Sequence, residues 1–207
     1  MTTTNICIWG DSIAYGAWDS AGGWVDRLRA YLHQREIDSR FEEYYWVYNL
    51  GIPGETSSDL IKRFEAELAP RTPHVALFAI GINDVCRQKA NGDAPRVSIE
   101  TYRENIRKFA DVAKRSAEQV VFVGLVSVDE NATQPFNGED AYFSHSDMLA
   151  YNEALVDEAE KAGALYIDML NLLAPEDLFD GLHPNASGHE KMYVQIRDFL
   201  LAKGVVS

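Results

Sequence analysis

The chain has 207 residues, of which 46% are hydrophobic, and 32 acidic residues against 19 basic ones give it a net charge of −13. This length supports one domain with a sizeable core and is too short for two comfortable ones, so we expect a single domain over residues 1–207. The acidic balance makes nucleic acid and anionic membranes poor partners.

The N-terminal segment has no basic region, and the apolar run that follows it is far shorter than a signal sequence or a membrane span. We therefore expect a cytoplasmic protein with no membrane span. Cys7 lies in an apolar run and Cys86 lies just after another. Both are expected to be buried free thiols rather than partners in a disulfide.

The first apolar run, residues 6–9, stops abruptly at Gly10, Asp11 and Ser12. Such a run predicts a buried strand, and the glycine permits a sharp turn after it. Ser12 would then lie at the carboxyl end of a strand, where open α/β sheets bind ligands. Alternatively, Asp11 and Ser12 only cap the next helix. This stretch alone leaves both interpretations open.

Further along the chain, buried-strand patterns alternate with segments whose apolar residues recur at helical spacing. Thr56 or Ser57 is expected to cap the second helix, Pro70 and Pro73 to end it, and Asp147 to cap the fourth. The predicted strands cover residues 6–9, 44–50, 75–80, 120–126 and 165–167, and the predicted helices cover 24–34, 57–69, 98–117, 147–161 and 186–203.

This alternation predicts a five-stranded, mostly parallel sheet between two helical layers, a three-layer α/β/α sandwich. Residues 127–145 are polar, with three aromatic residues among them, and we expect a long loop there. A loop of that length in a compact domain is often functional.

Polar or glycine-rich clusters occur at four strand-to-loop transitions: residues 10–12, 49–54, 81–84 and 180–183. Parallel strands place their carboxyl ends on one edge of a sheet, so these clusters can meet in space although they are far apart in the sequence. The sequence therefore predicts a site at that edge.

The residue types in these clusters suit nucleophilic catalysis. A serine hydroxyl such as that of Ser12 becomes a strong nucleophile when a base takes its proton, and histidine suits this task at neutral pH. His183 can be that base, and Asp180, three residues earlier on a turn, can reach the other ring nitrogen. These three residues are the catalytic candidates.

Acyl transfer also develops an oxyanion, which needs preorganised hydrogen-bond donors. The candidates are the main-chain N–H of Ser12, the main-chain N–H of Gly51 and the side-chain amide of Asn83. Glycine at position 51 is expected because a side chain there would obstruct the approach of the substrate oxygen to the main chain.

In order and spacing, the four clusters resemble the four motif blocks of the SGNH, or GDSL-type, hydrolases, and the resemblance spans residues 6–190. It implies a flavodoxin-like α/β/α fold and hydrolysis of a small-molecule ester without metal or cofactor. One departure is Ile13, where the family's common name implies leucine. The resemblance assigns the nucleophile to Ser12, the base to His183, its partner to Asp180, and the oxyanion donors to Ser12, Gly51 and Asn83.

Other sites receive structural or open interpretations. Asp11 and Asp84 are expected to hold loops rather than to perform chemistry, and His189 to be a surface or packing residue. Four aromatic residues either line an acyl or alcohol pocket or pack in the core: Trp18, Trp24, Phe136 and Phe143. The sequence has no Gly-x-Gly-x-x-Gly after the first strand and no Walker motif, which sets nucleotide sites aside.

The resulting expectation is a serine hydrolase that cleaves esters of small or short-acyl substrates. A carbohydrate O-deacetylase, a thioesterase and a lysophospholipase remain alternatives on the same site. A non-catalytic ligand-binding protein on this scaffold is the alternative from another functional class.

Overall fold

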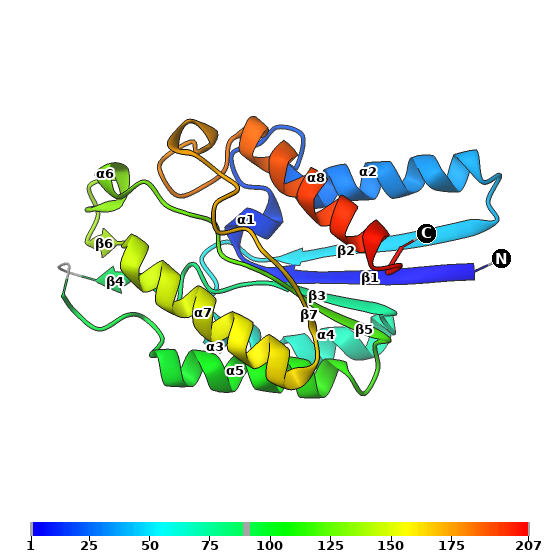
Figure 1. Ribbon diagram of the computed structural model, residues 1–207, viewed down its shortest axis with the longest axis horizontal. Coiled ribbons are helices and arrows are strands. Elements are labelled where there is room, and N and C mark those ends of the chain that lie inside the picture. Colours follow the sequence, from blue (N-terminus) through cyan, green and yellow to red (C-terminus); the bar gives the residue numbers. More distant parts are fainter. Residues whose placement is uncertain (1, 89–91, 207) are drawn as a thin grey trace.

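A sheet of five parallel strands forms the centre of the molecule (Figure 1). The structure is a computed structural model that describes residues 2–88 and 92–206. The strand order is β2–β1–β3–β5–β7, which confirms the predicted five-stranded α/β fold. The strands are β1 (Thr2–Gly10), β2 (Glu43–Gly51), β3 (Val75–Ala79), β5 (Gln119–Val123) and β7 (Leu165–Ile167).

Helices cover both faces of this sheet (Figure 1). On one face lie α2 (Gly23–Asp38) and α8 (Ala186–Ala202). The other face carries α4 (Phe64–Arg71), α5 (Ile99–Ala113) and α7 (His145–Ala162). The remaining helices are short: α1 (Ser12–Tyr15), α3 (Ser57–Leu60), α6 (Glu130–Thr133) and the 3₁₀ turn η1 (Pro175–Asp177).

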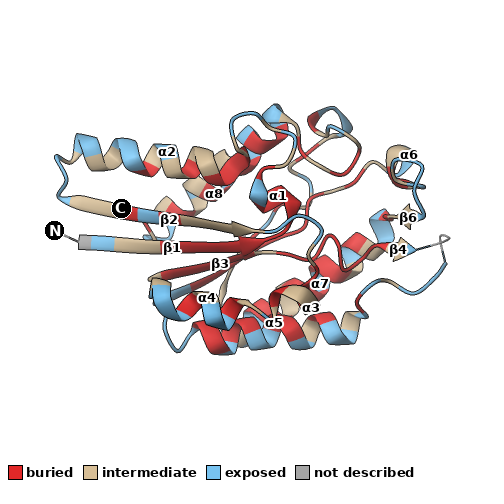
Figure 2. Cartoon of the chain, turned by 180° about the vertical axis from the view of Figure 1, so that it is seen from behind, coloured by how far each residue is buried: buried red, intermediate tan, exposed pale blue. Residues whose placement is uncertain are grey.

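The central strands are buried on both faces, which explains their continuous apolar sequences (Figure 2). Aromatic rings pack across the sheet and onto the helices beside it. Phe78 stacks on Trp9 at 5.3 Å and on Phe122 at 5.4 Å between ring centroids. Cys7 and Cys86 are buried free thiols, as predicted.

Several helix boundaries differ from the expected ones, and the helix expected over 57–69 is divided into α3 and α4. Pro70 lies inside α4, which ends one residue later, so the proline removes an N–H only near the last turn. The cap of α7 is Ser144, whose hydroxyl accepts a hydrogen bond from the N–H of Asp147 at 3.1 Å. The carboxylate of Asp147 instead pairs with Arg87, 60 residues away in sequence.

Residues 127–145 contain more regular structure than the predicted loop. The helix α6 occupies part of the segment, and the two-residue strand β6 (Ala141–Tyr142) pairs antiparallel with β4 (Arg87–Gln88). This small second sheet lies beyond the carboxyl ends of the main strands (Figure 1). The segment is therefore positioned next to the predicted site.

One edge of the sheet is β2, and side chains bind several of its main-chain groups. Glu36 accepts a hydrogen bond from the N–H of Tyr45 at 2.5 Å, and the Arg29 guanidinium donates to the carbonyl of Val47 at 3.2 Å. The side chain of Asn49 accepts the N–H of Gly51 at 3.0 Å. These bonds satisfy main-chain N–H and C=O groups of β2 that form no hydrogen bond with β1.

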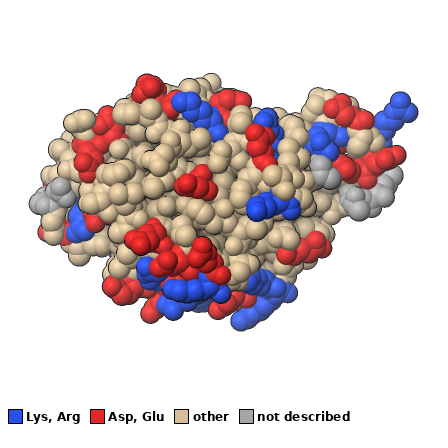
Figure 3. All heavy atoms as spheres, in the orientation of Figure 1, with Lys and Arg blue, Asp and Glu red and all other residues tan. Residues whose placement is uncertain are grey.

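On the molecular surface, many Lys and Arg side chains lie beside Asp and Glu side chains (Figure 3). Within residues 2–88 and 92–206, no helix is both long and apolar enough to cross a bilayer.

The chain order of the strands reverses between β1 and β3. The chain runs outward from β1 to β2 and then returns to the far side of β1 to form β3. Such a switch point opens a crevice at the carboxyl ends of the two strands, where α/β proteins bind ligands. The segments that follow β1 and β3 carry Ser12 and Asn83.

Candidate active site

A tight turn from β1 into α1 presents Ser12. Asp11 caps the helix and accepts the N–H of Ile13 at 2.9 Å. Gly10 makes the turn possible, because a Cβ atom there would lie 2.4 Å from the carbonyl oxygen of Ala79. Both sequence interpretations hold in part, since Asp11 caps the helix and Ser12 begins it at the edge of a cavity.

Three predicted side chains form a continuous hydrogen-bonded chain. The Ser12 Oγ atom lies 2.9 Å from Nε2 of His183, and Nδ1 of His183 lies 2.8 Å from Oδ2 of Asp180. The other oxygen of Asp180 accepts the main-chain N–H groups of Leu182 at 3.1 Å and His183 at 2.8 Å. The turn itself thus fixes the carboxylate against the imidazole.

Asp180 is suited to remain ionised in this arrangement. Burial alone would raise the pKa of its carboxyl group, but the hydrogen bonds from His183 outweigh this effect and hold the pKa below its ordinary value. An ionised carboxylate at Nδ1 orients the imidazole and stabilises its protonated form.

Beside this chain lies a cavity of about 690 Å³. Trp18, Phe136 and Phe143 line this cavity, and Phe143 is also buried in the core, whereas Trp24 lies in the core alone. The complete lining is Ser12, Tyr15, Gly16, Ala17, Trp18, Asp19, Ser20, Pro53, Gly54, Asn83, Phe136, Phe143, Leu182 and His183.

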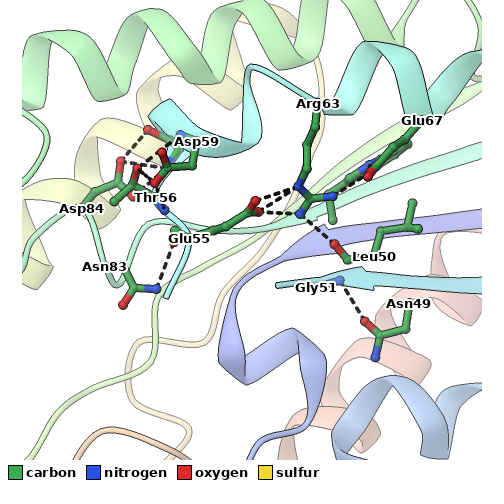
Figure 4. Close-up of polar contacts among 12 residues, drawn as sticks. Asn49, Leu50, Gly51, Glu55, Thr56, Asp59, Arg63, Glu67, Asn83 and Asp84 are labelled. Carbon is green, nitrogen blue, oxygen red and sulfur yellow. Dashed lines mark hydrogen bonds and ion pairs between the residues drawn. The ribbon is translucent and has the colours of Figure 1, made fainter. Parts of the chain in front are cut away.

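Gly51 differs from its expected placement. Its N–H is bound by the Asn49 side chain, and it does not line this cavity (Figure 4). A Cβ atom at position 51 would lie 2.6 Å from the main-chain nitrogen of Tyr15, so glycine is required for the packing of β2 against α1 and not for the approach of a substrate. Gly54, from the same glycine-rich cluster, lines the cavity instead.

Asn83 does reach the cavity, as expected. Its side-chain nitrogen donates a hydrogen bond to the main-chain carbonyl of Glu55 at 2.9 Å (Figure 4). An amide nitrogen has two hydrogens, so one remains for a ligand. The same bond connects the segment after β3 to the segment after β2.

One guanidinium holds the loop that carries Gly54. Arg63 donates to the carboxylate of Glu55 at 2.8 and 3.0 Å and to the carbonyl of Leu50 at 2.8 Å (Figure 4). Glu67 binds the same guanidinium at 2.6 Å. Because Leu50 and Glu55 flank the loop, a single side chain fixes both of its ends.

A buried polar network lies behind Asn83. The carboxylate of Asp84 accepts the main-chain N–H of Ser57 at 2.9 Å and also binds its hydroxyl, and Asn105 donates to that hydroxyl at 2.9 Å. Burial raises the pKa of Asp84 to about 7, against the lowering effect of the Ser57 hydrogen bonds. Burial also raises the pKa of Asp11 to about 7. The structural roles expected for both residues agree with these contacts.

The raised pKa of Asp84 leads to a prediction for stability. The folded protein keeps this proton up to about pH 7, whereas the unfolded chain releases it near pH 3.8. Stability is therefore lost as the pH rises between these values, by about 2 to 3 kcal/mol from about pH 5 to about pH 7 for this one group. Asp84→Asn should remove that part of the slope, measured as the free energy of urea unfolding at each pH.

The matched control is Asp111→Asn, which changes an exposed carboxylate on α5. It controls for the loss of one carboxylate elsewhere on the protein. An unchanged slope in Asp84→Asn would contradict the raised pKa.

The other candidates have plain roles. His189 is fully buried, with Nε2 3.3 Å from the carbonyl oxygen of Ala17, so it packs beneath the loop after α1, as expected. Over the part of the chain that is described, no group of three or more His, Cys, Asp or Glu side chains is arranged to hold a metal ion.

Comparison with known proteins gives a consistent result. The profile of the GDSL-like Lipase/Acylhydrolase family matches residues 8–191. An acetylxylan esterase of Geobacillus stearothermophilus is 27% identical over 156 residues, 69% of this chain and 66% of that protein. A multidomain esterase of Ruminococcus flavefaciens is 27% identical over 138 residues, 65% of this chain and 15% of that protein. The matches thus span less than two thirds of either relative.

The fold also resembles solved structures. LAE5, an alpha/beta hydrolase enzyme from the metagenome of Lake Arreo, superposes with a TM-score of 0.73 at 22% identity, over 99% of this chain and 96% of that one. The match to the family profile covers all four motif clusters found in the sequence. The chain therefore belongs to the GDSL-like lipase/acylhydrolase family.

Proposed function

We propose that the protein is a serine hydrolase that cleaves carboxylic esters through an acyl-enzyme on Ser12. The observation that carries this proposal is the hydrogen-bonded chain from Ser12 through His183 to Asp180 at the wall of the cavity. Membership of the family supports ester hydrolysis as the reaction class.

In the first half of the reaction, the Ser12 Oγ atom attacks the ester carbonyl carbon while Nε2 of His183 takes its proton. The tetrahedral intermediate collapses, the bond to the alcohol oxygen breaks, and His183 gives the proton to that oxygen. In the second half, water attacks the acyl-enzyme and loses a proton to His183, which returns it to Ser12 as the acid leaves. Asp180 holds the imidazole throughout.

We propose three donors for the oxyanion: the main-chain N–H groups of Ser12 and Gly54 and the side-chain amide of Asn83. All three residues line the cavity. Neither main-chain N–H has a hydrogen-bond partner within the described ranges. Around Gly54, no atom lies within 4 Å of the place where a Cβ would stand, so a substrate oxygen can approach its main chain.

The substrate class that we propose is an ester with a small or short acyl group. The similarity to an acetylxylan esterase supports an acetyl ester. Thioesters and lysophospholipids contain the same acyl carbonyl, so the activity assay should include them beside acetyl esters.

A fluorophosphonate probe tests the proposal directly, because it reacts only with a serine that a base has activated. Mass spectrometry should find the probe on the peptide that contains Ser12, and His183→Ala should abolish the labelling. The unmodified chain should also hydrolyse 4-nitrophenyl acetate. If neither labelling nor ester turnover occurs in folded protein, the proposal fails and a non-catalytic ligand-binding role is favoured.

A further inference from the structure

Two exposed aromatic side chains lie together beside the cavity: Trp18 lines it, and Phe179 packs against Trp18. Trp18 and Phe179 have exposed fractions of 61% and 66%, the highest among the large hydrophobic residues described. Their ring centroids are 6.0 Å apart, and the ring planes are inclined by 33°. The two residues come from opposite ends of the chain. Exposed apolar side chains that gather at a cavity commonly mark a binding surface.

Both aromatic residues belong to the surroundings of His183. The Trp18 ring meets the imidazole edge to face, with centroids 6.0 Å apart at 85°. Phe179 lies on the same turn as the histidine and donates its N–H to the carbonyl of His183 at 2.7 Å. A third ring, that of Phe136, lies 6.1 Å from the imidazole. The aromatic pair is therefore on the histidine side of Ser12.

The position beside His183 identifies the part of the ester that these rings can contact. In the proposed mechanism, His183 gives its proton to the alcohol oxygen as that group leaves. The alcohol must therefore lie next to the imidazole during acylation. Side chains around the imidazole therefore contact the alcohol part of the ester. The acyl part is bonded to Ser12 in the acyl-enzyme.

The loop that carries Trp18 is held in place from both sides. Trp18 itself has a φ of +65°, a left-handed conformation that bulky residues rarely adopt. Before it, the N–H of Ala17 donates to the carbonyl of Ser12 at 3.0 Å. After it, the buried carboxylate of Asp19 accepts the N–H groups of Ala21 and Gly23, each at 3.1 Å. A preorganised ring loses little entropy when a ligand binds.

We propose that Trp18 and Phe179 form an alcohol subsite that stacks on one face of a sugar ring, so that the substrate is an O-acylated carbohydrate. This inference rests on the proposed ester hydrolysis. A pyranose presents C–H groups on its faces, which the negative face of an aromatic ring attracts, and its hydroxyls point outward into water. Because both rings are more than half exposed, they cover one side of a ligand and leave the other side hydrated.

A long alkyl chain fits this surface less well, because its stabilisation depends on removal from water on all sides. The net charge of −13 also disfavours an anionic lipid surface as the source of the ester. The exposed aromatic pair thus favours a carbohydrate alcohol over a lipid one.

Two acetyl esters that differ only in the alcohol test the subsite: a monoacetylated methyl β-xylopyranoside and ethyl acetate. The xyloside is chosen because its equatorial hydroxyls leave C–H groups on both faces. Trp18→Ala and Phe179→Ala should each lower kcat/KM for the acetylated xyloside about tenfold. For ethyl acetate, kcat/KM should change less than about twofold.

Trp46→Ala is the matched control, because Trp46 is 56% exposed on β2 and does not line the cavity. It should alter neither reaction. The hydrolysis rate of the acetyl-enzyme, measured after a burst with 4-nitrophenyl acetate, should be unchanged in every variant, because the alcohol has already left. A slower hydrolysis of the acetyl-enzyme in Trp18→Ala would show that the ring only supports His183 and would overturn the subsite.

Equal losses on both esters, or a loss confined to ethyl acetate, would also overturn the carbohydrate assignment. Failure of the proposed function is recognised separately, as the absence of hydrolysis of every ester by the unmodified chain. In that case, saturation-transfer NMR tests the subsite by measuring whether methyl β-xylopyranoside binds to the Ser12→Ala protein. A signal that Trp18→Ala removes supports the subsite, and no signal in Ser12→Ala overturns it.

Discussion

Replacing Ser12 with alanine is expected to lower kcat/KM for 4-nitrophenyl acetate by about 10⁴- to 10⁶-fold. The variant has no atom at the position of Oγ, so no acyl-enzyme can form and His183 has no hydroxyl to activate. The fold should persist, because the short helix α1 already contains one alanine, Ala14, and Asp11 still caps this helix. Steady-state kinetics and circular dichroism on the same preparation test both statements.

Ser20→Ala is the control for this substitution, because Ser20 lines the same cavity but is not hydrogen-bonded to His183. Its activity should stay within a few-fold of the unmodified chain. A Ser12→Ala protein that keeps more than one per cent of the activity would rule out Ser12 as the nucleophile, whereas equal losses in both variants would indicate damage to the cavity as a whole.

Replacing Asn83 with alanine is expected to lower kcat by about 10²- to 10³-fold. The substitution removes a side-chain donor from the cavity, and an oxyanion donor acts most strongly in the transition state. It also removes the hydrogen bond to the carbonyl of Glu55, which fixes the loop of Gly54. The kinetic signature is a fall in kcat with a smaller change in KM, measured on an acetate ester.

Asn49→Ala separates the two effects of losing an amide. The Asn49 amide also makes two hydrogen bonds: it donates to the carbonyl of Ala14 at 3.0 Å and accepts the N–H of Gly51. It does not line the cavity. It should lower the unfolding midpoint and change kcat less than about tenfold. A loss of under tenfold in folded Asn83→Ala would contradict its role as an oxyanion donor.

The meeting of Ser12 and Asn83 was predictable because each follows a buried strand. Continuous apolar runs identify buried parallel strands, and parallel strands place their carboxyl ends on one edge. The polar residues directly after those runs must then lie near one another. The apolar runs also predicted the three-layer fold. Asp180 and His183 lie well beyond the end of β7 at Ile167, and their pairing was predicted instead from their spacing on one turn.

That Gly54 rather than Gly51 faces the cavity was not predictable from residue type. Both are glycines in one cluster, and what separates them is local geometry. The side chain of Asn49 takes the N–H of Gly51, and Gly54 has a φ of +80° at the turn that faces the cavity. Neither fact follows from the hydrophobic pattern.

The exposure of the aromatic residues was not predictable from the sequence either. Trp18 and Trp24 lie six residues apart, yet one is 61% exposed and the other is fully buried. The difference arises from the left-handed turn at Trp18 and from the start of α2 at Gly23. The short pairing of β4 with β6 was missed for a related reason, because two residues are too few to show a period.

The side-chain bonds along the outer edge of β2 affect how the protein behaves at high concentration. This strand is nine residues long and rich in aromatic residues, a composition that readily recruits further strands and seeds fibrils. An incoming strand would first have to displace Glu36 from Tyr45, Arg29 from Val47 and Asn49 from Gly51. This edge is therefore closed to templated growth while the protein is folded. Growth at β2 should require local unfolding of α2, which supplies two of these three side chains.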